Sequence, residues 1–507
     1  MNRRQFCASA ATLALGACSK PPSRPNILLI VADDMSFPHA GAYGDKIPAT
    51  PAFDRIAREG VLFHNSFCAS PSCTPSRTAI LSGKNIWQTS EAGVLYGALP
   101  PNLRLFPHLL EDAGYCTGYT GKGWGPGDWK ALGLKRSPTG REFNSSLIPL
   151  PGPPGIDTRD YAENFAQFLA ACPAHQPFFF WMGVTEPHRV YAKGAGLAAG
   201  KKLADVTLPA YYPDSAEIRS DFLDYYMEIE WIDLHLARTL SILQRHKKLD
   251  DTLIIVTSDN GLPFPRAKVN LYDDGLRMPF AMRWGRRFTG NQQVQDFIQH
   301  IDIAPTILEA AGIKPPEDMA GRSFLSLQGG NRAIAAMERH TWCRPDGATY
   351  PMRSLRNHQF HYIRNFAPGR WPTGGPDFIS SNKTPHGDVD ACPTKDFLTD
   401  PANQRKYPRE FQLCFGKRPA EELYSVQADR WQVNNLAADP AHQSTLASMR
   451  AELESYLQQT ADPRIQGSDP WQSYPYRQTT GFGATFNTTL SEEERRQARE
   501  RASHKPE

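Results

Sequence analysis

Six polar side chains stand just beyond short apolar segments that the sequence predicts to be buried strands. They are Asp33, Asp34, Lys122, His188, Asp259 and Asn260. Ligands of open α/β sheets bind at the carboxyl ends of the strands, so residues far apart in the chain are expected to meet there. Three carboxylates gathered in one place would repel one another without a cation. The pattern therefore predicts a metal site at this edge of the sheet.

The oxygen-bearing members of this set indicate which metal to expect. The side chains of Asp33, Asp34, Asp259 and Asn260 are hard ligands, which suit calcium or magnesium better than zinc. Taken singly, Asp33-Asp34 is typical of a turn or helix cap, and Asp259-Asn260-Gly261 is typical of a turn. Their placement after neighbouring strands favours the metal site.

The segment "SCTPSR", residues 72–77, combines a cysteine with a helix start. Pro75 suits the first turn of a helix through "PSRTAILSG", with Cys73 or Thr74 as its N-cap. Free N–H groups at such an end attract anions, and Arg77 adds a planar donor for a tetrahedral oxyanion. Three roles for Cys73 stay open here: a small cap residue, part of an anion site, or a thiolate whose pKa the helix dipole lowers.

The sequence "CTPSRTAILSG" resembles the signature of the type I sulfatase family, in which Cys-x-Pro-Ser-Arg marks a cysteine oxidised to formylglycine. Three further segments resemble the heparan N-sulfatase (N-sulfoglucosamine sulfohydrolase) branch: "TSDNGLPFPRAKVNLY", "EPHRV" and "YPMRSLRNHQFHYIRN". The segment "ELYSVQADRWQVNNLAADP" is similar to a common sulfatase ending. The resemblance covers nearly the whole exported chain.

This resemblance implies a role for each site residue. Formylglycine formed from Cys73 would be the nucleophile, acting as its aldehyde hydrate, and one calcium ion would be bound by an oxygen of that hydrate and by Asp33, Asp34, Asp259 and Asn260. Arg77 would stabilise the hydrate, Lys122 and Lys268 would bind the sulfate, and His188 would protonate the leaving group. The resemblance also implies a partner, a formylglycine-generating or sulfatase-maturating enzyme that acts in the cytoplasm before folding.

The chemistry explains why such a site needs these groups. Sulfuryl transfer builds charge that a divalent ion, Lys and Arg offset. One hydroxyl of the hydrate attacks sulfur, and loss of the other's proton expels sulfate and restores the aldehyde. The family has a histidine for this second step two residues after the lysine, whereas Gly123 and Trp124 follow Lys122 here. His39 or a metal-bound carboxylate is then the candidate base, and Trp124 is either a sugar-stacking platform or a structural residue.

The favoured substrate is the N-sulfate of glucosamine in heparan-type oligosaccharides, as in glycosaminoglycan degradation. Alternatives are an O-sulfatase acting on another polysaccharide, such as an algal one, a phosphonate or phosphodiester hydrolase, and a weakly catalytic lipoprotein that binds sulfated glycans. Four further polar residues are expected at the surface: Glu186, Arg189, His340 and Arg353.

The elements that must position these residues follow from the apolar pattern. From Asn26 onward, short apolar segments alternate with amphipathic helices, which predicts an α/β domain with a buried sheet. The resemblance implies an alkaline-phosphatase-like sulfatase fold, with a large mixed, mostly parallel sheet between helices and a smaller C-terminal α+β subdomain holding a short antiparallel sheet. The expected boundaries are 21–330 for the catalytic domain, 331–466 for the subdomain and 467–507 for a polar tail. Helices are expected at 50–60, 105–114, 220–248, 301–312 and 441–460.

Residues 1–20 look like a targeting segment. Arg3-Arg4, a short apolar run and "LGAC" predict a twin-arginine signal with a lipoprotein box, so that Cys18 becomes the acylated first residue. A plain secretory peptide is the alternative. The protein is therefore expected in the periplasm or at the cell surface, with membrane contact only through the lipid.

Charge and cysteine content narrow the class further. A net charge of +3 without a basic block gives no reason to expect a nucleic-acid partner. The cysteines include no Cys-x-x-Cys pair of the zinc or thiol-redox type. For an exported chain, a disulfide between Cys392 and Cys414 is predicted from their modest separation.

Overall fold

The computed structural model describes residues 24–148, 156–376 and 384–477. The predicted signal and the lipidation site at Cys18 lie outside these residues, as does the end of the polar tail. Among the helices of the described ranges, none is both long and apolar enough to cross a membrane.

The larger sheet has eight strands in the order β4-β3-β5-β1-β6-β7-β2-β8. Its strands are β1 (Asn26–Ala32), β2 (Val61–Phe67), β3 (Cys116–Gly121), β4 (Arg141–Glu142), β5 (Phe178–Gly183), β6 (Thr252–Ser258), β7 (Arg277–Arg283) and β8 (Gln292–Gln299). Strand β7 is antiparallel to both neighbours, and the other pairs are parallel. This confirms the predicted mixed, mostly parallel sheet.

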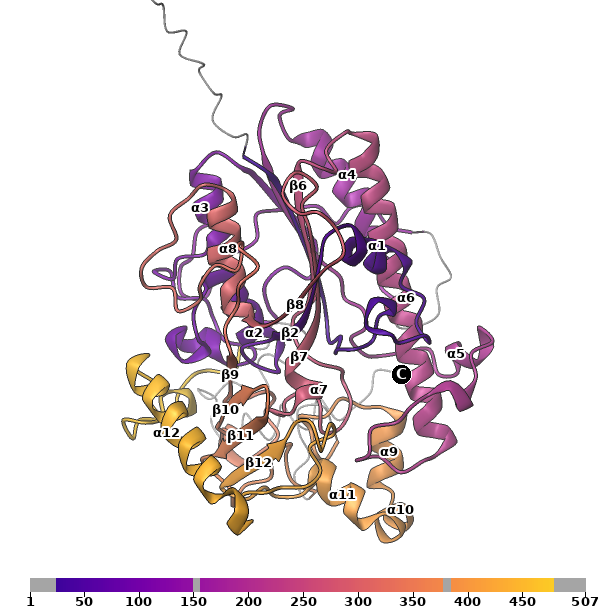
Figure 1. Ribbon diagram of the computed structural model, residues 1–507, viewed down its shortest axis with the longest axis vertical. Coiled ribbons are helices and arrows are strands. Elements are labelled where there is room, and N and C mark those ends of the chain that lie inside the picture. Colours follow the sequence, from indigo (N-terminus) through magenta and orange to yellow (C-terminus); the bar gives the residue numbers. More distant parts are fainter. Residues whose placement is uncertain (1–23, 149–155, 377–383, 478–507) are drawn as a thin grey trace, which may run out of the picture.

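Helices cover both faces of this sheet (Figure 1). On one side lie α1 (Pro51–Glu59), α4 (Tyr161–Ala171) and α6 (Ala216–Arg245), and on the other α2 (Cys73–Ser82), α3 (Phe106–Asp112) and α8 (Ile303–Ala310). The pleat of β1 explains the two layers, because alternate side chains point to opposite faces. Leu28 and Ile30 join one apolar core, and Ile27 and Leu29 join the other.

The C-terminal part forms a second, antiparallel sheet in the order β12-β11-β10-β9. Its elements are β9 (Arg332–Met337), β10 (Met352–Asn357), β11 (Phe360–Asn365), β12 (Glu421–Ser425) and the helices α9 (Pro393–Thr399), α10 (Pro401–Lys406), α11 (Pro408–Phe415) and α12 (Gln443–Gln459). Two short helices, α5 (Ala195–Ala198) and α7 (Asp273–Leu276), belong to the larger unit. Met278 and Phe297 of the large sheet share one apolar core with Ala335 and Met352 of the small one.

The structure shifts or adds several elements. Helix α6 begins four residues before the predicted 220–248 segment because the Ser215 side chain accepts a hydrogen bond from the Ile218 N–H and caps it. Strand β8 was not predicted, since only Val294, Phe297 and Ile298 are buried and its sequence "QQVQDFIQ" is largely polar without alternation. It lies at an edge of the sheet, where it pairs with only one strand of that sheet, β2.

The disulfide prediction was wrong. Cys116 and Cys172 form the bond, while Cys392 and Cys414 are free and buried. Cys392 instead caps α9, where its sulfur accepts a hydrogen bond from the Lys395 N–H. Cys392 and Cys414 are close in sequence but do not form a bond. Cys172 follows α4 and Cys116 begins β3, and these two elements pack side by side.

Candidate active site

The acidic cluster is created by two adjacent strands. In the parallel pair β1 and β6, Ala32 lies opposite Ser258, so Asp33 and Asp259 emerge at the same edge. The backbone N–H of Asp34 donates to Asp259 Oδ1 across 3.1 Å. Asp34 has a φ of 76°, a left-handed conformation that is uncommon for a residue with a side chain and is frequent at functional sites.

Cys73 is the first residue of α2, and Ser72 is the N-cap. The predicted N-cap at Cys73 or Thr74 was therefore one or two residues late, because the extended backbone ends at Ser72. The Ser72 side chain makes no capping bond and instead contacts His340. All ten residues of α2 are buried, and Cys73 Sγ lies 3.6 Å from Asp33 Oδ1.

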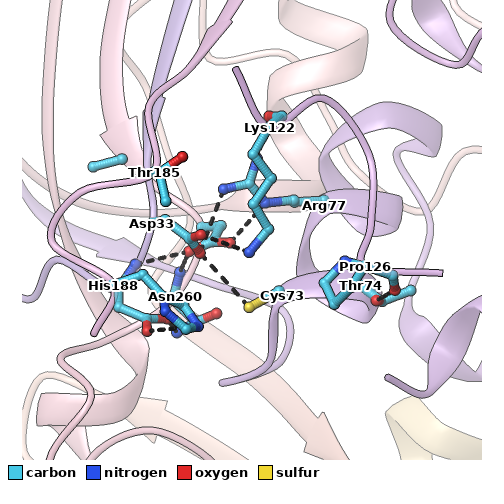
Figure 2. A network of polar contacts seen from close by, with 12 residues as sticks. Asp33, Cys73, Thr74, Arg77, Lys122, Pro126, Thr185, His188 and Asn260 are labelled. Carbon is cyan, nitrogen blue, oxygen red and sulfur yellow. Dashed lines mark hydrogen bonds and ion pairs between the residues drawn. The ribbon is translucent and has the colours of Figure 1, made fainter. Parts of the chain in front are cut away.

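Three cations face the three carboxylates, and Figure 2 shows Arg77 and Lys122 directed at Asp33. Lys122 Nζ donates to Asp33 Oδ2 across 2.6 Å, and Arg77 Nε donates to Asp259 Oδ2 across 2.7 Å. Lys268 Nζ donates to Asp34 Oδ2 across 2.7 Å. The structure thus brings all the predicted cationic residues to the acidic cluster.

His188 and Asn260 complete the cluster, and Figure 2 shows both of them near Cys73 and Asp33. His188 Nδ1 donates to the Arg189 carbonyl oxygen at 2.7 Å, and Nε2 lies 3.8 Å from Asp34 Oδ2. Asn260 Nδ2 donates to Asp34 Oδ1 across 2.7 Å.

Burial and charge together set the protonation of this cluster. Burial alone would raise the pKa of Asp33, but Lys122 and Arg77 hold it well below its usual range. Burial raises the pKa of Asp259 to about 6, and repulsion from Asp33 works in the same direction. Burial also raises the pKa of the Cys73 thiol far above its ordinary value. The unmodified cysteine is therefore a protonated thiol at neutral pH, which argues against the thiolate alternative.

The donor set fits a hard divalent cation. Asn260 Oδ1 is buried and has no hydrogen-bond partner, although such groups are almost always satisfied. Asp33, Asp34 and Cys73 each offer one atom within 4.8 Å of the others. Oxygen ligands of this kind bind calcium or magnesium, and a cation among them would relieve the repulsion between buried carboxylates.

A cavity of about 260 Å³ opens onto Cys73. The predicted residues Lys122, His188 and Lys268 line it, together with His340 and Asp390 from the C-terminal part. Asp390 Oδ2 accepts a hydrogen bond from Lys268 Nζ across 3.2 Å. Sequence reasoning missed Asp390, which belongs to no motif and follows no predicted strand.

Neither the candidate base His39 nor Trp124, the candidate sugar platform, lines this cavity. His39 is hydrogen-bonded to Asp45 and lines a different cavity of about 720 Å³. Trp124 is absent from the residues that line the Cys73 cavity. Its indole N–H donates to Thr78 Oγ1 across 2.7 Å, and its half-buried ring packs against an apolar core. Of its two predicted roles, the structural one is supported.

The four residues expected at the surface are all buried or nearly so. Arg189 forms a forked pair with Asp221, at 2.7 and 2.9 Å. Glu186 accepts hydrogen bonds from the Tyr161 hydroxyl and the Asp157 N–H, and burial raises its pKa to about 7. Polar residue type alone misled the prediction, because these side chains find partners inside the protein.

The fold and the site together define a hydrolase of the alkaline-phosphatase-like class. The sulfatase family model matches residues 25–313, and the chain belongs to the sulfatase family. It is 28% identical to human N-sulphoglucosamine sulphohydrolase, over 91% of this chain and 95% of that one. It is also 28% identical to an ulvan-active sulfatase of Formosa agariphila, over 87% and 76% of the two chains.

A solved structure shares the architecture. The protein crystallised with its substrate D-glucosamine-2-N,6-O-disulfate superposes with a TM-score of 0.62, at 18% identity, over 89% of this chain and 100% of that one. The predicted family and fold are confirmed, as is the prediction that the chain is a hydrolase.

Proposed function

We propose that this sulfatase removes sulfate from a sulfated sugar, using formylglycine formed at Cys73 and a calcium ion held by Asp33, Asp34, Asp259 and Asn260. The observation that carries the proposal is the shared cavity. It brings the first residue of α2 together with Lys122, His188 and Lys268 beside a buried acidic cluster.

The residues of the chain have separate tasks in this reaction. The formylglycine hydrate would supply the attacking oxygen, and a bound calcium ion would offset charge on the sulfate. Lys122 and Lys268 line the cavity beside Cys73 and bind the sulfate oxygens through their ammonium groups. His188 donates a proton to the leaving atom, and its Nδ1–H bond to the Arg189 carbonyl fixes the ring so that Nε2 faces the site.

The favoured substrate is the N-sulfate of glucosamine at the end of a heparan-type oligosaccharide. Support comes from the similarity to the human N-sulphoglucosamine sulphohydrolase, which extends over nearly the whole of both chains. The cavity of about 260 Å³ is at the small end for ligand pockets, which favours one sugar residue over the interior of a polymer. O-sulfate hydrolysis on an algal polysaccharide is the second candidate, supported by the similarity to the ulvan-active sulfatase.

Export and lipid attachment at Cys18 form part of the proposal, as does maturation by a formylglycine-generating enzyme. The twin-arginine pattern and the Cys116–Cys172 disulfide support an oxidising compartment. An intact Cys18 thiol in protein purified from its host would contradict lipid attachment.

Two measurements test the function. Mass spectrometry of the peptide containing Cys73, from protein made in its natural host, is expected to show the aldehyde in place of the thiol. Sulfate release is then compared between N-sulfated and O-sulfated glucosamine and ulvan fragments, with a phosphonate monoester as counter-substrate. An unmodified cysteine, or glycan binding without hydrolysis of any of these compounds, would overturn the proposal in favour of a binding lipoprotein.

A further inference from the structure

A histidine from the C-terminal part lies against the segment that carries Cys73. His340 Nδ1 is 2.8 Å from Ser72 Oγ, and Ser72 directly precedes Cys73. The ring is only 4% exposed, yet it lines the same cavity as Cys73. Nε2 makes no hydrogen bond to the described residues. When Nδ1–H donates to Ser72, Nε2 keeps a free lone pair.

The backbone next to His340 is held firmly. The N–H and hydroxyl of Thr341 both donate to Asp388 Oδ1, across 2.7 and 2.8 Å. Asp388 Oδ2 accepts from Arg344 Nη2 across 2.7 Å, and the Asp388 side chain is fully buried. Such supporting contacts fix the orientation that a proton-transfer group needs.

The ring is neutral under ordinary conditions. Burial lowers the pKa of His340 to about 4, and the nearby Lys268 and His188 act in the same direction. Asp388 and Asp390 oppose this effect without cancelling it. A neutral imidazole is able to accept a proton at neutral pH.

We propose that His340 is the base that resets the enzyme, in place of the histidine that is absent at position 124; this inference rests on the proposed formylglycine mechanism. After sulfuryl transfer, Nε2 takes the proton of the hydroxyl left on the residue 73 side chain. The O–H electron pair becomes the second bond of C=O, the carbon–oxygen bond to the sulfate breaks, and sulfate leaves with the electron pair of that broken bond. His340 then passes the proton to water, and a second water adds to the aldehyde.

The other histidines near the cleft do not fit this task. His188 is already assigned to the leaving group and lies beside Asp34. His39 lines the separate cavity with Asp45, so it has no path to the residue 73 side chain within the Cys73 cavity.

The test separates the first turnover from the later ones. His340→Asn keeps an amide near the position of Nδ1 for Ser72 but has no Nε2. With 4-nitrophenyl sulfate, the variant is expected to release about one equivalent of nitrophenol per formylglycine and then stop, because step two is blocked. Steady-state turnover should fall by about 10²–10⁴-fold. Mass spectrometry of the residue 73 peptide should show a retained sulfuryl group, which is independent of turnover.

Matched variants cover the other outcomes. His39→Asn should turn over like the wild type, and His340→Gln serves as a second replacement should the Asn variant fold poorly by melting temperature. Steady turnover by a folded His340 variant, or a sulfuryl group retained by His39→Asn instead, would overturn the inference. If His340→Asn carries the aldehyde but releases no initial equivalent of nitrophenol, the inference is also overturned, because the first step would then need His340. A wild-type protein with neither aldehyde nor sulfatase turnover would instead refute the proposed function itself.

Discussion

Arg77 Nε donates to Asp259 Oδ2 across 2.7 Å, and both side chains are fully buried. The bond joins the first turns of α2 to the end of β6. Asp259 Oδ1 accepts backbone N–H groups from Asp34 and Asn260. The carboxylate is therefore locked in place, so the acidic cluster and the start of α2 are a single preorganised unit.

Replacement of Asn260 is expected to weaken metal binding, because its Oδ1 is buried and has no hydrogen-bond partner. Asn260→Ala removes this buried acceptor of the acidic cluster. Calcium should therefore raise the melting temperature of the chelated wild type but raise that of the variant much less. We expect activity to fall at least tenfold, in line with weakened metal affinity. The exposed Asn434→Ala is the control. An equal calcium response in Asn260→Ala would rule this residue out as a ligand.

A buried charge cluster in the C-terminal part should control stability. Arg353 pairs with Glu338 at 2.8 Å and with Asp462 at 2.6 Å, and all three are buried. Arg353→Met leaves two carboxylates short of a partner and is expected to cost about 3–5 kcal/mol of unfolding free energy in denaturant titrations.

The control for that experiment is an exposed pair. Arg104, 53% exposed, contacts Asp318 at the surface, and Arg104→Met should cost under about 1 kcal/mol. Similar losses for the two variants would contradict a special role for the buried cluster.

Glu228 in α6 predicts a pH dependence of stability. Burial, with Glu186 and Asp224 nearby, raises its pKa from 4.5 to about 8, and Oε2 has no partner. The folded state therefore binds this proton more tightly than the unfolded state. Its stabilising contribution is complete below pH 4.5 and is lost as the pH rises to about 8.

In Glu228→Gln, the melting temperature should consequently depend less on pH between 5 and 8.5. At the alkaline end, the free energy of unfolding should exceed that of the wild type by up to roughly 5 kcal/mol. The matched control is Glu317→Gln, because Glu317 is 88% exposed and its carboxylate pairs with Lys314 at the surface. If the wild type and Glu228→Gln showed the same change of melting temperature over this pH interval, Glu228 would not be the group responsible.

The disulfide should contribute measurably to stability. Cys116 and Cys172 are 56 residues apart, and closing a loop of this size is worth about 4 kcal/mol by the chain-entropy relation. Cys116→Ala should lower the melting temperature and make it insensitive to reductant. Cys414→Ala, in which only a free thiol is removed, should keep the wild-type response to reductant. The reverse pattern would restore the rejected pairing with Cys392.

Much of the catalytic cleft was predictable because it follows from strand ends. Asp33 and Asp259 stand one residue past two buried apolar strands, and a parallel pair brings such positions together whatever the details of the loops. Local signals were weaker at α2, where proline placement identified the helix but put its N-cap at Cys73 or Thr74 instead of Ser72.

The remainder of the cleft depends on contacts between distant segments. His340 and Asp390 reach it from loops of the C-terminal part, and Asp388 ties one of these loops to the other. No periodicity marks them, and a histidine among polar residues looks like a surface side chain. Similarly, Cys116 and Cys172 meet only because α4 packs beside β3, which spacing along the chain does not reveal.

The complete burial of α2 has a consequence for biosynthesis. In the finished protein Cys73 is 2% exposed, and its cavity is bordered by residues that the ribosome adds long afterwards, such as His340 and Asp390. Any enzyme that modifies this cysteine must reach it while the emerging chain is still open. The order of synthesis thus provides a limited period for maturation, which closes when the last third of the polypeptide docks.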